Sequence, residues 1–95
     1  MATMTERTAT IASRVGLHAR PAAIFAEAVR GLDIDVTIAH EGEPADEALD
    51  AASILSLMSL GAFHGDVVVL RGDGAGADDA LDTLVKILET DHDAE

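Results

Sequence analysis

The hydrophobic repeat of this chain switches between helix-type and strand-type periods, and this switching constrains the fold more than any other feature. Apolar residues recur at helical spacing over 19–32, where Pro21 suits a first helical turn and Gly31 a helix end. Over 34–38 they alternate with polar residues, which is typical of a half-buried strand. The amphipathic stretch 77–90 predicts a final helix.

Three further segments are predicted to be extended. β-branched residues indicate an opening strand over 5–13. The acidic stretch 40–50 contains a glycine and a proline and predicts a turn followed by a short third strand. The wholly apolar run 67–70 predicts a central strand, because a strand that is buried on both faces needs no polar alternation.

A second, short helix is predicted over 54–60. Ser53 is a favourable residue just before a helix, and Gly61 suits the position just after one. The complete order is then βαββαβα, in one domain over 1–95 with a short flexible N-terminus and an acidic C-terminal tail. This order favours an α+β two-layer sandwich, in which the strands share one layer and the helices cover one face.

The charge and cysteine content exclude several classes of function. The chain has 18 acidic against 6 basic residues, a net charge of −12, and no cysteine. Nucleic-acid binding needs clustered Lys and Arg, so it is not expected. No stretch approaches the roughly 20 apolar residues of a membrane span. We expect a cytoplasmic protein without metal or cofactor. A salt-rich cytoplasm would tolerate this acidity, and an ordinary acidic cytosolic protein is the alternative.

The segment Gly16-Leu17-His18-Ala19-Arg20-Pro21-Ala22 lies at a predicted strand-to-helix junction and carries the candidate chemistry. If His18 precedes the helix, the backbone N–H groups of Ala19 and Arg20 are free to bind an anion there. A phosphoryl group on His18 would meet these N–H groups, and Arg20 would add a charge-assisted hydrogen bond. The alternative is a helix-capping histidine beside a surface arginine.

Residues 16–22 resemble the active-site signature of HPr, the histidine-containing phosphocarrier family of the bacterial phosphoenolpyruvate:sugar phosphotransferase system. Residues 52–61 are similar to that family's serine-site helix, and the resemblance extends over roughly 5–88, including the order of elements. It implies an open-faced sandwich: an antiparallel four-stranded sheet in the order 1-4-2-3, covered on one face by three helices.

The resemblance also implies a function. His18 would be phosphorylated on Nδ1 by phospho-Enzyme I, with phosphoenolpyruvate as the ultimate donor, and would pass the group to a sugar-specific Enzyme IIA domain. Arg20 would stabilise the phosphohistidine. The protein would be a monomeric carrier and not an enzyme. Two alternatives remain: a regulatory or dihydroxyacetone-kinase-linked relative with the same chemistry, and a non-phosphorylated interaction module.

Ser53 has two interpretations. It is expected to cap the helix that follows it. It also matches the position that a dedicated kinase phosphorylates in some members of the resembling family, which makes it a possible regulatory site. Ala52 replaces the basic residue that usually precedes that serine, and the acidic flank of Asp46, Glu47 and Asp50 would oppose an added phosphate.

The helix over 54–60 has more apolar surface than one buried stripe can use. The resemblance implies that four residues meet a partner protein: Ile54, Leu55, Met58 and Arg30. Leu57 and Leu60 are then expected in the core, and the alternative is that all five apolar residues of the helix are buried. Lysines that are frequent on the family's docking face are replaced here by Glu27, Ala52 and Ser56.

Overall fold

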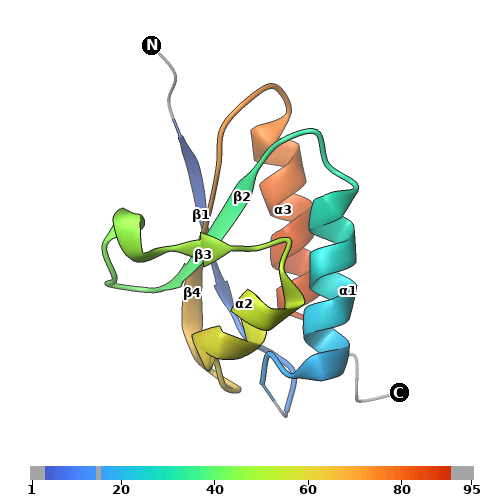
Figure 1. Ribbon diagram of the computed structural model, residues 1–95, viewed down its shortest axis with the longest axis vertical. Coiled ribbons are helices and arrows are strands. Elements are labelled where there is room, and N and C mark those ends of the chain that lie inside the picture. Colours follow the sequence, from blue (N-terminus) through green and yellow to red (C-terminus); the bar gives the residue numbers. More distant parts are fainter. Residues whose placement is uncertain (1–3, 15, 91–95) are drawn as a thin grey trace.

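A computed structural model describes residues 4–14 and 16–90 of the chain (Figure 1). The predicted N-terminal and C-terminal tails, 1–3 and 91–95, lie outside the described residues. The observed order confirms βαββαβα, with a short 3₁₀ turn (η1) after the second strand. The elements are β1 (Thr5–Thr10), α1 (Ala19–Arg30), β2 (Val36–His40), η1 (Ala45–Glu47), β3 (Leu49–Asp50), α2 (Ile54–Leu60), β4 (Val67–Gly72) and α3 (Ala77–Leu88).

The four strands form one antiparallel sheet in the order β1-β4-β2-β3. Figure 1 shows the three helices on one side of this sheet, so the predicted open-faced sandwich is confirmed. The core lies between the two layers. Val68 and Leu70 of β4 are fully buried there, together with Phe25 of α1 and Leu81 of α3.

The strand limits differ from the predicted ones because pairing sets them. Gly72 is the register partner of both Thr5 and Val36, so the central strand runs two residues past the predicted end and fixes where its neighbours begin. β1 ends at Thr10 and not at residue 13. Beyond it, the Ala12 N–H donates to the carbonyl oxygen of Leu88 at the end of α3 (3.0 Å), so the chain there contacts a helix and no longer a strand.

The helices follow their local signals more closely. α1 ends at Arg30, and the N–H of its C-cap Gly31 donates back to the Glu27 carbonyl. α2 has the predicted limits. α3 is two residues shorter than predicted, ending at Leu88. Helix ends therefore depend on residues within a turn of the end, whereas strand ends depend on a distant partner.

One ion-pair cluster ties the first strand to the last helix. The Arg7 guanidinium donates through Nε to Asp82 (2.9 Å) and through Nη2 to Asp78 (3.2 Å). The hydrogen bond to Asp82 is the main cause that raises the pKa of Arg7. These groups are largely in contact with solvent, so the cluster contributes modestly to stability.

Candidate functional site

His18 occupies the N-cap of α1, as predicted, with extended backbone (φ −99°, ψ −174°) and an exposed side chain. Its ring makes no capping hydrogen bond to the helix. The alternative, a histidine whose side chain caps this helix, is therefore wrong. The exposed imidazole is therefore accessible from solvent and does not use the N–H groups of the first turn.

The loop that carries His18 rests against the chain just after α2. Gly16 has a positive φ of +77°, and a Cβ there would lie 2.6 Å from the Ala62 carbonyl oxygen, closer than real contacts allow. Only glycine fits both the conformation and the approach. The next residue, Leu17, donates its N–H to the same Ala62 oxygen (2.9 Å). His18 is thus held beside the end of α2.

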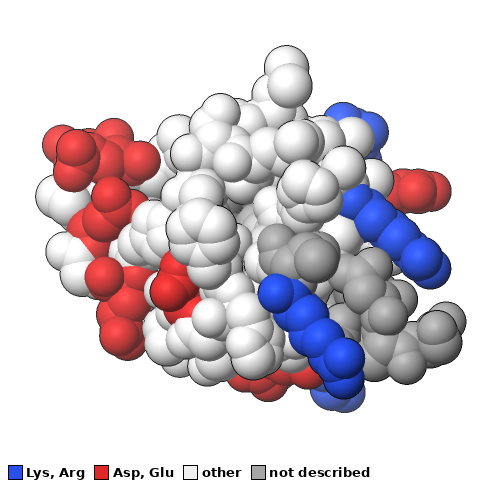
Figure 2. Space-filling view, turned by 90° about the horizontal axis from the view of Figure 1, so that it is seen from below, with Lys and Arg blue, Asp and Glu red and all other residues white. Residues whose placement is uncertain are grey.

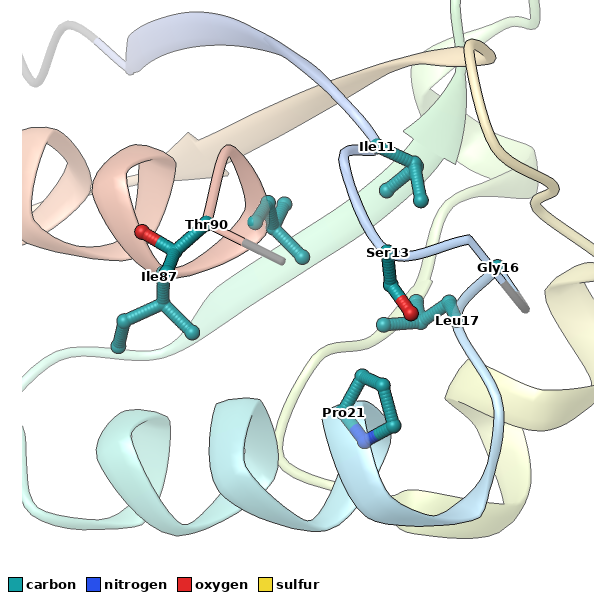
Figure 3. Close-up of a pocket in the computed structure, with 8 residues that line it drawn as sticks. Ile11, Ser13, Gly16, Leu17, Pro21, Ile87 and Thr90 are labelled. Atoms are coloured by element: carbon teal, nitrogen blue, oxygen red, sulfur yellow. The ribbon is translucent and has the colours of Figure 1, made fainter. Parts of the chain in front are cut away.

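The inner side of this loop is packed while its outer side is open. A small cavity lies beneath it, and Figure 3 shows side chains of the loop, of the start of α1 and of the end of α3 arranged around this cavity. Leu17 and Pro21 are buried at its wall. His18 and Arg20, by contrast, are exposed. The buried residues fix the loop, and the exposed ones remain accessible.

The first turn of α1 has the properties of an anion site. Its N–H groups, which include those of Ala19 and Arg20, have no acceptor within the helix. Pro21 follows and has no N–H to satisfy. The exposed guanidinium of Arg20 lies in the same turn. Among the described residues, no three His, Asp or Glu side chains are grouped to hold a metal ion.

The start of α2 is built differently. The Ser53 hydroxyl oxygen accepts a hydrogen bond from the Ser56 N–H (3.2 Å), which confirms the predicted N-cap. The Asp50 carboxylate accepts one from the Ala52 N–H (2.9 Å) in the preceding turn. Ser53 therefore acts as the N-cap of α2.

The apolar residues of α2 divide between the core and the surface. Leu57 is fully buried, and Leu60 packs against the core as expected. Leu55 is 78% exposed and Met58 42% exposed, so the alternative that all five residues are buried is wrong. Ile54 is half-buried and packs against the core, so only part of its side chain is open to a partner.

Two more exposed residues, Phe63 and Arg30, belong to this part of the molecule. Phe63, in the loop after α2, is 69% exposed and was not predicted as part of the site. The only sequence signal was a large aromatic residue between Gly61 and Gly65, outside any amphipathic repeat. Arg30, predicted as a docking residue, is exposed and donates through Nε to the Ala52 carbonyl oxygen (3.1 Å).

Charge is unevenly distributed over this end of the molecule. Figure 2 views it from below: the acidic residues gather mainly on the side of the β2–β3 connection, basic residues lie on the side of α1, and a neutral surface separates them. The acidic side includes the exposed residues Glu41, Glu43, Asp46 and Glu47. The exposed large apolar residues of α2 and the loop after it, Leu55, Met58 and Phe63, carry no charge.

Comparison with known proteins identifies the family. A family model described as "PTS HPr component phosphorylation site" matches residues 5–90. The chain belongs to the HPr family. The HPr relatives include the phosphocarrier protein HPr of Streptomyces coelicolor, 42% identical over 86 residues, which cover 90% of this chain and 88% of that protein.

A second phosphocarrier protein HPr, from Haloferax volcanii, is 42% identical over 85 residues, covering 90% of this chain and 93% of the relative. Among solved structures, the HPr of Bacillus anthracis superposes with a TM-score of 0.80 at 28% identity, covering 90% of this chain and 98% of that one. Membership of the HPr family implies a phosphocarrier that works with partner proteins of the phosphotransferase system.

Proposed function

We propose that this chain accepts a phosphoryl group on Nδ1 of His18 from phospho-Enzyme I and passes it to a sugar-specific Enzyme IIA domain. One observation carries the proposal: an exposed histidine stands at a helix start whose first-turn N–H groups no side chain of the N-cap uses. Phosphoenolpyruvate is the ultimate donor. The protein itself is a carrier and needs no cofactor or metal.

The transfer is a simple displacement. The Nδ1 lone pair of neutral His18 attacks phosphorus, an N–P bond forms, and the bond between phosphorus and the donor breaks with its electrons returning to the donor. The N–H groups of Ala19 and Arg20 and the Arg20 guanidinium donate hydrogen bonds to the oxygens of the transferred phosphoryl group. Delivery to the acceptor repeats the displacement with His18 as the leaving group.

The partner face is the exposed side of α2 together with the loop after it. We propose that Leu55, Met58 and Phe63 enter an apolar cleft of Enzyme I or the Enzyme IIA domain, with part of Ile54 at the edge. Burial of exposed apolar side chains favours association. The net charge of −12 gives no long-range attraction to an acidic partner. Arg20 and Arg30 can act only as local anchors.

Other interpretations are less well supported. A regulatory or dihydroxyacetone-kinase-linked carrier would use the same His18 chemistry with different partners, and the identity of the acceptor separates it from the sugar-transport branch. A non-phosphorylated interaction module has no need for an open helix start beside an arginine. Ser53 remains a predicted regulatory site, at the N-cap of α2.

Location and assembly are proposed as well. In the part of the chain that the structure describes, no helix has both the length and the apolar character to cross a membrane. We propose a monomeric, cytoplasmic carrier, in keeping with small partner-exchanging proteins that must leave one complex before entering the next.

The experiment is direct. The protein is incubated with phosphoenolpyruvate and Enzyme I, and its mass is measured before and after brief acid treatment. A gain of one phosphoryl group that acid removes supports the proposal. Purified Enzyme IIA domains for several sugars are then offered as acceptors. No mass gain with an active Enzyme I would refute the carrier function, and transfer to a dihydroxyacetone-kinase subunit alone would favour the alternative branch.

A further inference from the structure

α2 is too short to keep its position unaided. It has seven residues, of which only Leu57 is fully buried. Helices of fewer than about 12 residues are marginal in water, because few hydrogen bonds offset the cost of starting the helix. The place and direction of α2 therefore depend on the elements that contact it, and so does the place of Leu55 and Met58 on its exposed side.

A side chain from the sheet reaches the end of this helix. His40, the last residue of β2, places Nε2 2.7 Å from the carbonyl oxygen of Leu60, the last residue of α2. The last carbonyl groups of a helix have no donor within it. Since a carbonyl oxygen only accepts, Nε2 must carry the hydrogen. His40 thus supplies the donor that α2 lacks at this end.

The backbone of His40 is itself held by hydrogen bonds. His40 pairs with Val68 of the central strand, and its own N–H donates to the Glu43 carboxylate (3.0 Å). The other end of α2 is tied to α1 by the hydrogen bond from Arg30 to Ala52. Just beyond Leu60, the Ala62 carbonyl accepts from Leu17 in the His18 loop. The hydrogen bond from His40 to Leu60 is therefore only two residues along the chain from Ala62, which binds the His18 loop.

From this arrangement we propose that His40 is a positioning residue for phosphoryl transfer. Its hydrogen bond to Leu60 fixes the end of α2, so that Leu55 and Met58 meet a partner in a constant relation to His18. His40 acts through the helix and touches no transferred atom. This inference rests on the proposed function and adds to it the residue that holds the docking helix in place.

Two substitutions at position 40 test the hydrogen-bond donor of His40 separately from the shape of its side chain. His40→Phe keeps a planar ring and removes the N–H, whereas His40→Gln places an amide N–H near the position of Nε2. We expect His40→Phe to raise the KM of the protein as substrate of phospho-Enzyme I about five-fold, the effect of one lost hydrogen bond, with kcat within about two-fold. His40→Gln should restore the KM. Amide hydrogen exchange in α2 should be faster in His40→Phe alone.

Arg7→Gln is the matched control. It breaks the hydrogen bonds to Asp78 and Asp82, which tie β1 to α3 and do not involve α2. We expect a lower melting temperature and an unchanged KM. The proposal is overturned if His40→Phe has the KM of the wild type. It is equally overturned if Arg7→Gln raises the KM as much as His40→Phe does, because general loss of stability would then explain both.

The two proposals can fail separately. If the unaltered protein gains no phosphoryl group, the proposed function is wrong, and the exchange experiment still decides the role of His40. Faster exchange in α2 but not in α3 of His40→Phe, with wild-type exchange in His40→Gln, supports the structural part of the inference. Equal exchange rates in all three proteins overturn it.

Discussion

The starts of α1 and α2 differ in what satisfies their backbone N–H groups. At α2, the Ser53 side chain accepts from Ser56 and completes the helix internally. At α1, the N-cap is His18, and its side chain makes no such bond. One helix start is closed by its own residue, and the other is left open beside an exposed imidazole and an arginine.

A helix start that its own N-cap satisfies adds stability, whereas an unsatisfied start can bind a ligand. A closed start contributes about 1 kcal/mol of stability, whereas an open start keeps donors for a ligand. In the proposed site, α1 would contribute its end and α2 its exposed side, through Leu55 and Met58. Substitutions in one helix at a time can separate the two roles.

The largest effect is expected from closing the open start. His18→Ser gives α1 the kind of cap that α2 has and removes the proposed acceptor. We predict complete loss of acid-labile phosphorylation with an equal or higher melting temperature, since a serine cap stabilises a helix by about 1 kcal/mol. Mass spectrometry and calorimetry check both. Phosphorylation that persists on His40, His64 or His92 would show that another histidine is the acceptor.

A charge on the side of α2 should have the next largest effect. Met58→Asp places a carboxylate within the proposed apolar contact, and we predict a loss of transfer of about ten-fold or more, the size expected for a central interface residue. Steady-state transfer from Enzyme I measures it. Ala75→Asp is the control, because it adds the same charge at an exposed loop residue outside the site. Equal losses in the two variants would point to net charge and not to docking.

A milder change at α1 tests the arginine. Arg20→Lys keeps the positive charge but loses the forked guanidinium. We predict transfer slower by several-fold, about the contribution of one ordinary hydrogen bond, because lysine keeps the charge. The melting temperature should change little, because Arg20 is exposed. Rapid-quench kinetics gives the rate. Transfer at the wild-type rate would remove Arg20 from the site.

The smallest effect on transfer is expected from opening the closed start. Ser53→Ala removes the hydrogen bond to Ser56 and should lower stability by about 1 kcal/mol, or about 4–8 °C in melting temperature for a domain of this size. Phosphorylation of His18 should stay within about two-fold of the wild-type rate. A large loss of transfer at unchanged stability would mean that Ser53 acts in the site and not as a cap.

Local signals in the sequence predicted the helices well. Gly31, Ser53 and Gly61 mark helix ends through contacts within one turn, and the structure places each at the expected cap. The strand limits were less accurate, because Gly72 fixes them through pairing with residues far along the chain. The strand order 1-4-2-3 came from the resemblance to HPr and not from the periodicity.

Only part of the candidate site was predicted, because the rest depends on contacts between residues far apart in the sequence. The sequence placed His18 at the helix start, but it did not show that the ring leaves the first turn unused. Helical spacing predicted that α2 has more apolar residues than one buried stripe needs. It could not show which of them the neighbouring elements cover, and Ile54 packs partly against the core. The contact of His40 with Leu60 spans 20 positions and has no local signature.

The central claim is that the open start of α1 receives the phosphoryl group of His18, and amide NMR of the phosphorylated protein tests it most directly. After incubation with Enzyme I and phosphoenolpyruvate, we predict phosphorus on Nδ1 of His18, large changes in the amide shifts of Ala19 and Arg20, and an unchanged Ser56 amide. Phosphorylation of His18 with unmoved Ala19 and Arg20 amides would contradict the account, as would phosphorus on any other histidine.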